Sequence, residues 1–398
     1  MFSKGLQKRK YNILLNDIIG LRGFTQQTQL KRMNRVVSYD KFNYEFQSNV
    51  DASELFDVGP YEVLVQVPYV GICAGDTKCY LGAPLFHAPD KNGNTYFQKG
   101  CIPGHEFVGT VIELGEHSAE FYGLEIGDNA IAEQIVPCNE CQMCIQGDYN
   151  VCHPWNKEFK SRGAHEIYGF RTNYPGGMCT YMKYVKNSRI HKIPKEISLR
   201  DAVFLEPLSC AIHAVQRADI QLNDVVVISG AGAIGCGAIC AAKLKNPKCI
   251  IALDLIDFKL QVAKACGADI CLNPSKDNIL DIIMSMTNEY GAHKYIEATG
   301  APQSVSQGLD ILRRRGIFVE YSVFKEDVKM NMTRLSDEKQ LDIRGGHLGP
   351  HCYPTAINML YNGNVPTNQI ITHEYPMSQF LLGFATVDRD IMKLKHFR

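Results

Sequence analysis

Apolar and polar residues alternate over short stretches in the first half of the chain, from about Val36 to Ile193. Residues 61–67 and 107–113 show this alternation, and Gly, Pro and Asn separate such stretches from one another. A period of two places alternate side chains on opposite faces of a strand. The pattern therefore predicts a mostly antiparallel β domain in this half.

From about Leu205 the pattern changes to fully apolar stretches that alternate with amphipathic segments. Apolar strands are expected at residues 224–229, 249–253, 294–297 and 316–321, and one helix is expected to end near Leu312. Strands that alternate with helices are typical of βαβ units around a parallel sheet. The sequence thus predicts an α/β fold with a doubly wound parallel-sheet domain after the β-rich one.

The first predicted βαβ unit carries a glycine-rich turn, Gly230-Ala231-Gly232-Ala233-Ile234-Gly235, directly after its strand. These glycines allow a tight turn and a close approach of a pyrophosphate to the helix N-terminus. Asp254 follows the next strand, at the spacing expected for an acid that binds the adenosine ribose, and its charge favours NAD over NADP. Thr299, after a later strand, is predicted to line the same coenzyme site.

Four cysteines, Cys138, Cys141, Cys144 and Cys152, are spaced C-x2-C-x2-C-x7-C. The chain has 15 cysteines and no secretory apolar region, which favours a reducing compartment over a disulfide knot. No Cys-Pro run of the bacterial ferredoxin kind follows, although an iron–sulfur cluster also takes four thiolates. The spacing favours a closed, structural zinc site over four unliganded cysteines.

Charge and composition exclude several function classes. Lys plus Arg and Asp plus Glu are both 42, so no overall field favours nucleic acid or an anionic membrane. The longest apolar runs are too short to span a bilayer. Residues 1–33 form a basic extension that fits either a mitochondrial transit peptide or a basic tail, so we expect a cytoplasmic protein, with a mitochondrial one as the alternative.

A dehydrogenase without a flavin needs a Lewis acid to polarise its alcohol, and catalytic zinc takes about three protein ligands. The β-rich segment offers Cys73 and the pair His105-Glu106, and Glu206 stands where the two segments meet. A metalloprotease interpretation of His105-Glu106 fails, because Gly109 stands where the second histidine is needed. The residues alone leave open whether Cys73 is a core residue and Glu206 a helix N-terminal charge.

These motifs together resemble the zinc-dependent medium-chain dehydrogenase/reductase superfamily over residues 34–390. The resemblance implies a GroES-like catalytic domain (34–205), a Rossmann coenzyme domain (206–344) and a C-terminal return to the catalytic domain (345–398). It implies a catalytic zinc on Cys73, His105 and Glu206 with Glu106 near or transiently bound. The four clustered cysteines would hold a structural zinc, remote from the chemistry, in a dimer or tetramer.

Within this family the chain resembles the polyol branch, and there the erythritol/L-threitol dehydrogenases. The Arg-aromatic pair of sorbitol dehydrogenases is replaced by His347-Leu348, which favours a shorter polyol. The usual Ser or Thr two residues after the ligand cysteine is Gly75 here, so a water, Thr77 or a water network has to take the alcohol proton. Alternatives are a sorbitol, xylitol or L-threonine dehydrogenase, and a zinc- and NAD-binding relative without turnover.

Overall fold

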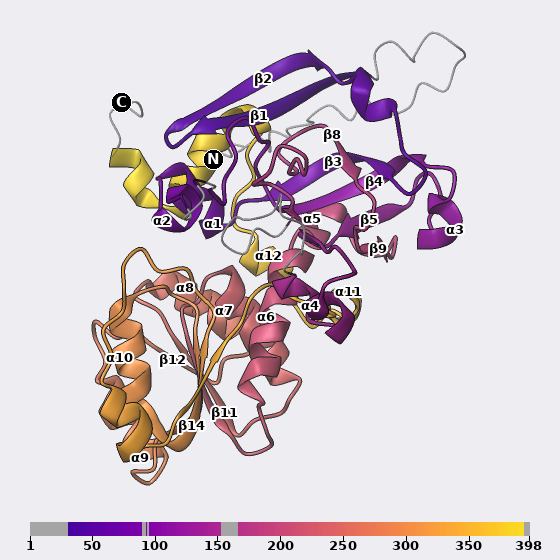
Figure 1. Cartoon of the computed structure of the whole chain (residues 1–398). Coiled ribbons are helices and arrows are strands. Elements are labelled where there is room, and N and C mark those ends of the chain that lie inside the picture. Colours follow the sequence, from indigo (N-terminus) through magenta and orange to yellow (C-terminus); the bar gives the residue numbers. More distant parts are fainter. Residues whose placement is uncertain (1–30, 90–92, 94, 153–165, 394–398) are drawn as a thin grey trace, which may run out of the picture.

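The chain folds into two parts that lie one above the other in Figure 1, with helices at their junction. A computed structural model describes residues 31–89, 93, 95–152 and 166–393. Most of the basic extension and the targeting segment predicted in it lie outside these residues. The described chain begins with a hairpin of β1 (Arg32–Asp40) and β2 (Asn43–Asp51), most of which lies within the β-rich segment predicted from about Val36.

The first part contains an antiparallel sheet, in which the described strands are ordered β8-β3-β4-β5-β9. Its strands are β3 (Val63–Gly71), β4 (Glu106–Leu114), β5 (Asn129–Ala132), β8 (Tyr181–Tyr184) and β9 (Ile190–Ile193). Val63, Val65, Phe107 and Val111 are buried in one cluster between the strands and the loops around them. The predicted alternation at residues 61–67 and 107–113 therefore does correspond to strands.

Short elements surround this sheet and carry most of the candidate ligands. They are η1 (Ser53–Phe56), α1 (Ala74–Tyr80), α2 (Pro84–His87), α3 (Ser118–Tyr122), β6 (Ile135–Val136), α4 (Gln142–Gln146), η2 (Tyr149–Val151), β7 (Glu166–Ile167) and α5 (Leu199–Ala202). Strands β6 and β7 pair with each other beside the four-cysteine segment.

The second part is a parallel sheet with the described strand order β12-β11-β10-β13-β14-β15. Its strands are β10 (Val225–Ser229), β11 (Cys249–Leu253), β12 (Ile270–Leu272), β13 (Ala292–Glu297), β14 (Leu312–Glu320) and β15 (Asp342–Gly345). Its helices are α6 (Leu205–Ala218), α7 (Ala233–Lys243), α8 (Asp257–Ala265), α9 (Ile279–Met286), α10 (Pro302–Ile311) and η3 (Arg334–Glu338).

Strand β10 shows why the strands of this sheet are apolar at consecutive positions in the sequence. Val226 and Ile228 belong to one buried cluster, whereas Val225 and Val227 belong to another, so both faces of the strand are covered. Parallel sheets with helices on both faces need apolar residues at every position. The architecture confirms the predicted fold class, a β-rich domain followed by a Rossmann-type sheet.

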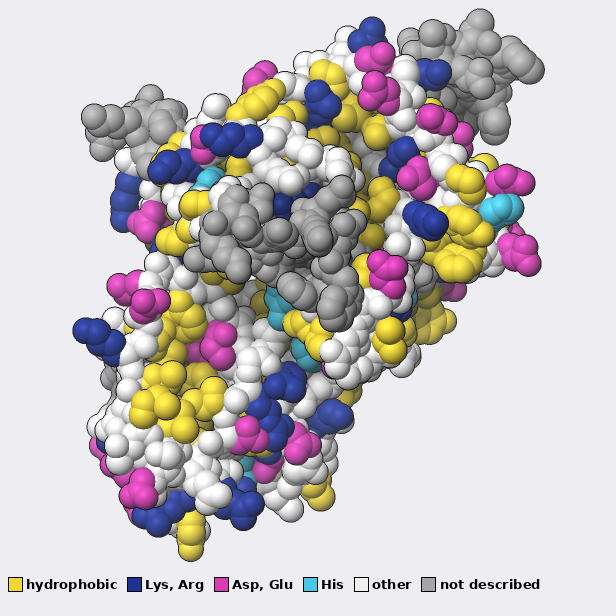
Figure 2. All heavy atoms as spheres, in the orientation of Figure 1, with side chains coloured by type: hydrophobic (Ala, Val, Ile, Leu, Met, Phe, Trp, Pro, Cys, Tyr) yellow, Lys and Arg dark blue, Asp and Glu magenta, His cyan; other side chains and the backbone are white. Residues whose placement is uncertain are grey.

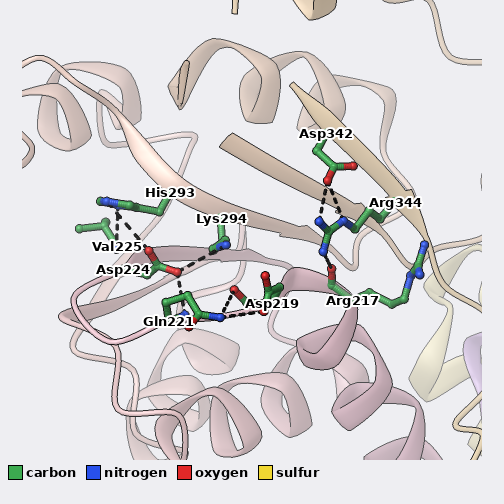
Figure 3. Close-up of polar contacts among 9 residues, drawn as sticks. All are labelled: Arg217, Asp219, Gln221, Asp224, Val225, His293, Lys294, Asp342 and Arg344. Carbon is green, nitrogen blue, oxygen red and sulfur yellow. Dashed lines mark hydrogen bonds and ion pairs between the residues drawn. The ribbon is translucent and has the colours of Figure 1, made fainter. Parts of the chain in front are cut away.

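Polar contacts hold the amino ends of this sheet together, opposite the glycine-rich turn (Figure 3). The buried Asp224 accepts a hydrogen bond from the Gln221 backbone N–H at 2.8 Å and lies 3.6 Å from the Lys294 ammonium. His293 Nδ1 accepts a hydrogen bond from the Val225 N–H. These contacts satisfy polar groups that would otherwise be buried where β10 and β13 begin.

The C-terminal segment passes back from the second part to the first. It contains α11 (Tyr353–Tyr361), α12 (Thr367–Ile370), η4 (Met377–Gln379), α13 (Phe380–Val387) and η5 (Arg389–Lys393). Phe384 on α13 packs its ring against Tyr80 of α1, at 5.8 Å between ring centroids. The last described helices therefore complete the core of the first part.

The surface matches the balanced charge of the sequence. On the face in Figure 2, acidic and basic side chains are interspersed without an extended region of one sign. Among the described residues, no helix has the length and apolar character that a bilayer span requires.

Candidate metal and nucleotide sites

Cys73 lies at the N-terminus of α1, directly after β3 ends. Its side chain accepts a hydrogen bond from the Gly75 N–H at 3.3 Å, and the Asp76 carboxylate accepts one from the Cys73 N–H at 3.0 Å. This reciprocal capping fixes the first turn of α1. The thiol therefore has one orientation, toward β4.

His105 and Glu106 lie where the neighbouring strand β4 begins. Glu106 pairs with Gly71 across the sheet, and a Cβ on Gly71 would be 2.1 Å from a Glu106 carboxylate oxygen. Glycine at position 71 therefore lets the Glu106 side chain fold across β3. The Asp76 carboxylate lies 3.3 Å from His105 Nδ1 and so orients the imidazole ring, as carboxylates do behind metal-binding histidines.

The ligand atoms of Cys73, His105 and Glu106 all lie within 4.8 Å of one another. Burial raises the pKa of the Cys73 thiol, and burial followed by the charge of Glu206 raises the pKa of Glu106 to about 8. A divalent cation at this point would stabilise the thiolate and the carboxylate in their charged forms. The sulfur, nitrogen and oxygen donors fit zinc.

Glu206 reaches this group from α6, on the other part of the molecule. It is not one of the three residues whose ligand atoms lie within 4.8 Å, although its charge acts on Glu106. Burial raises the pKa of Glu206, and one of its oxygens accepts a weak hydrogen bond from the Cys210 thiol at 3.4 Å. The group within 4.8 Å thus includes Glu106, which the resemblance placed near the zinc or transiently bound, and does not include Glu206.

The four-cysteine segment forms a second buried group of thiols, with α4 between its second and last members. All four sulfurs lie within 4.8 Å of one another, with separations that include 3.5 Å for Cys138–Cys152 and 3.9 Å for Cys138–Cys144. A tetrahedral zinc with Zn–S bonds of about 2.3 Å separates its sulfurs by about 3.8 Å. The sulfurs therefore fit one zinc ion.

Disulfide pairing of these thiols is not seen. All 15 cysteines lie in the described part of the chain, and no disulfide joins any of them. Backbone N–H groups of Cys138, Cys141 and Cys144 donate to neighbouring sulfurs of the group at 3.4–3.5 Å. Such hydrogen bonds stabilise thiolates over thiols, as metal binding requires. We call residues 138–152 the cysteine lobe.

The glycine-rich turn has the geometry of a pyrophosphate site. Gly230 has φ +98°, and a Cβ on Gly235 would be 1.7 Å from the Gly230 carbonyl oxygen, so both positions require glycine. Gly232 caps α7 and has open space where a Cβ would be. Ala233 and Ile234 form the first turn of α7, whose unpaired N–H groups face that space.

Asp254 follows β11 beside this turn. Its carboxylate accepts hydrogen bonds from the Ala231 and Ile256 N–H groups, both at 2.9 Å. The side chain therefore fixes the glycine-rich turn and retains lone pairs for a further donor. Thr299 is held by the buried Glu297 carboxylate, which accepts from both its N–H and its hydroxyl.

Some contacts between the two parts could not be predicted from the sequence. Lys78 on α1 donates to the Val323 carbonyl at 2.6 Å, and so ties the Cys73 helix to the loop after β14. Asp76 lies only three residues after Cys73, so the capping contact between them is local in the sequence. Lys78 and Val323 are 245 residues apart, and only the folded chain brings them together.

Two family models match the chain. The alcohol dehydrogenase GroES-like domain matches residues 59–195, and the zinc-binding dehydrogenase matches residues 233–362. The two matches cover the antiparallel part with the cysteine lobe and most of the parallel sheet.

Curated relatives and solved structures agree with these matches. The erythritol/L-threitol dehydrogenase of Mycolicibacterium smegmatis is 44% identical over 328 residues, which cover 82% of this chain and 88% of that protein. The sorbitol dehydrogenase of Halalkalibacterium halodurans is 28% identical, covering 81% and 87%. The structure of L-idonate 5-dehydrogenase from Escherichia coli is similar with a TM-score of 0.74 and 26% identity, covering 90% and 95%.

Proposed function

The chain belongs to the polyol branch of the zinc-dependent medium-chain dehydrogenases, and from this premise we propose that it oxidises erythritol or L-threitol to the ketose with NAD⁺. The reaction takes a hydride from the carbon of a secondary hydroxyl and a proton from its oxygen, so that ketose, NADH and H⁺ are formed. The observation that carries the proposal is the buried group of Cys73, His105 and Glu106, tied through α1 to the coenzyme sheet.

Neighbouring residues orient the proposed metal ligands or leave room for them. Cys73, His105 and Glu106 would hold a zinc ion, whose Lewis acidity lowers the pKa of the substrate hydroxyl while the nicotinamide accepts the hydride. Asp76 orients His105, and Gly71 leaves room for Glu106. We assign Glu206 to the opposite wall, where its carboxylate faces Glu106 and accepts hydrogen bonds from water or substrate.

The substrate proton has no hydroxyl relay at position 75. Thr77 does not replace it, because its hydroxyl donates to the Ala74 carbonyl at 2.9 Å and the side chain is buried. We therefore assign the proton's exit to water. Removal of the substrate proton then depends on solvent, and Gly75→Ser would add a hydroxyl that could take its place.

NAD is the cofactor that the glycine-rich turn and Asp254 favour. A carboxylate beside the Ala231 N–H would repel a 2′-phosphate, and it accepts hydrogen bonds from the ribose hydroxyls of NAD. We also propose two zinc ions per chain, one on Cys73, His105 and Glu106 and one in the cysteine lobe. A homodimer or homotetramer, as the sequence resemblance implies, belongs to the same proposal.

The test is NADH formation with a panel of erythritol, L-threitol, sorbitol, xylitol and L-threonine, each with NAD⁺ and with NADP⁺, on protein of measured zinc content. We expect the highest kcat/KM for a four-carbon polyol with NAD⁺. A preference for sorbitol, xylitol or L-threonine would overturn the substrate, and a preference for NADP⁺ would overturn the role of Asp254. No turnover despite bound zinc and tight NAD⁺ binding would assign the chain to the relatives without turnover.

A further inference from the structure

The loop from His347 to His351 connects β15 to α11 and lies beside Glu206. One narrow cavity is lined by Glu206, by Leu348, Gly349 and Pro350 of this loop, and by Tyr149 and Asn150 of the cysteine lobe. The lobe therefore shares this cavity with Glu206, and α4 is drawn close to α11 in Figure 1. The resemblance implied a lobe remote from the chemistry; the cavity brings the lobe to Glu206, and its lining does not include Cys73, His105 or Glu106.

The 347–351 loop has a backbone conformation that needs outside support. Leu348 has φ +51° and His351 has φ +60°, in the left-handed region that non-glycine residues rarely adopt. Gly349 lies directly on α6, where a Cβ would be 2.4 Å from backbone and side-chain atoms of Ser209. Contacts with neighbouring elements must hold such a strained loop in place.

On the side that faces α6, hydrogen bonds to the Leu348 carbonyl hold the loop in place. The Leu348 carbonyl accepts from His213 Nδ1 at 2.7 Å and from the Tyr321 hydroxyl. Because a carbonyl only accepts, His213 carries its proton on Nδ1 in this contact. These bonds fix the middle of the loop against the second part of the molecule.

The ends of the loop are held by the cysteine lobe. Asn150 donates from Nδ2 to the His347 carbonyl at 2.8 Å, and the Tyr149 hydroxyl accepts from the His351 N–H at 2.7 Å. The same hydroxyl donates to the buried Glu133 carboxylate at 2.8 Å, so it cannot rotate away without losing a second bond. His351 Nε2 also bonds the Gly147 carbonyl at 2.8 Å.

We propose that Tyr149 and Asn150 make the cysteine lobe a positioning element of the polyol pocket, because they hold the 347–351 loop beside Glu206. Both residues lie between Cys144 and Cys152, so binding of one metal ion by the four thiols fixes the segment that carries them. The inference rests on the proposed function for its substrate. The metal of the lobe then sets affinity for the polyol while NAD⁺ affinity stays independent of it.

Two isosteric variants test this in the full chain. Tyr149→Phe removes the hydroxyl and keeps the ring that packs on His351, and Asn150→Asp replaces the donor to the His347 carbonyl with an acceptor. Ile145→Ala is the control, because Ile145 is in the same lobe with its side chain 75% exposed. We expect KM for the polyol to rise about tenfold in each variant, with zinc content, thermal midpoint and NAD⁺ affinity near those of the control.

Hydrogen exchange of the 347–351 segment, followed by mass spectrometry, is the second readout and needs no turnover. The His351 N–H should exchange faster in Tyr149→Phe, and the segment should also exchange faster in Asn150→Asp, whereas β10 should not change. Unchanged exchange together with unchanged polyol KM would overturn the proposal. A parallel loss of NAD⁺ binding and thermal midpoint would overturn it too, since the lobe would then be a brace of the whole fold.

The same data separate this inference from the proposed function. If the unaltered protein oxidises no polyol of the panel, the proposed substrate fails. Faster exchange in the variants would still support the contact between lobe and loop. If polyols are oxidised normally and both variants match Ile145→Ala in KM and exchange, only the positioning role fails.

Discussion

The two groups of metal-ligating side chains differ in how far apart their members lie along the chain. The cysteine lobe takes all four thiols from residues 138–152, and its own N–H groups bond its sulfurs. The reaction-site group takes Cys73 from the start of α1 and His105 and Glu106 from the start of β4, with Glu206 added from α6. One group is local, and the other exists only after the sheet and the two parts of the chain have assembled.

Because of this difference, we expect substitutions in the two groups to affect stability and activity differently. A local site is stabilised by its metal, because binding by all four thiols cross-links a short segment that has little regular structure of its own. A site assembled from distant elements is stabilised by the fold, and its metal adds chemistry. Substitutions of the lobe's four cysteines should therefore lower stability first, whereas substitutions among Cys73, His105 and Glu106 should lower activity first.

The largest effect is expected for Cys73→Ala. We expect kcat/KM for the polyol to fall on the order of 10³-fold or more, because one of three ligands to the Lewis acid is lost. Zinc content should fall by one ion per chain, while NAD⁺ binding and the thermal midpoint change little. Turnover near that of the unaltered protein would mean that this group is not the reaction site.

The opposite outcome is expected for Cys138→Ser in the lobe. Loss of the lobe's metal should cost roughly 3 kcal/mol, which lowers Tm by about 4 °C in a protein of this size. Turnover at low temperature should persist with a raised polyol KM, because the 347–351 loop loses its support. A drop in kcat as large as that of Cys73→Ala, with Tm unchanged, would contradict the comparison.

An intermediate effect is expected for Gly71→Ala, which perturbs the assembled site without replacing a ligand. The new Cβ would be 2.1 Å from the Glu106 carboxylate, so Glu106 has to leave its position. We expect kcat to fall about 100-fold with a stability loss of about 1–2 kcal/mol. The control is Gly345→Ala, where a Cβ meets nothing within 4 Å, and equal activity of the two variants would show that Glu106 is dispensable.

The comparison also explains which parts of the molecule could be predicted from the sequence. The cysteine lobe and the glycine-rich turn are local patterns, and the structure brings their residues together as expected. The 347–351 loop could not be placed beside the lobe, because Asn150 and His347 are 197 residues apart and no sequence pattern connects them. The relative positions of Glu106 and Glu206 depend likewise on how the two parts pack.

The smallest effect is expected for Gly75→Ser, which restores a hydroxyl beside Cys73. A Cβ on Gly75 would lie 3.6 Å from the Cys73 sulfur and 3.8 Å from His105 Cε1, which are ordinary contact distances. Stability should change by less than about 1 kcal/mol, since the first turn of α1 accepts serine. If water carries the substrate proton, kcat should rise a few-fold and its solvent isotope effect should decrease. Gly75→Ala fills the same space without a hydroxyl, so an equal change in both variants would assign the effect to packing and leave the proton's exit to water unsupported.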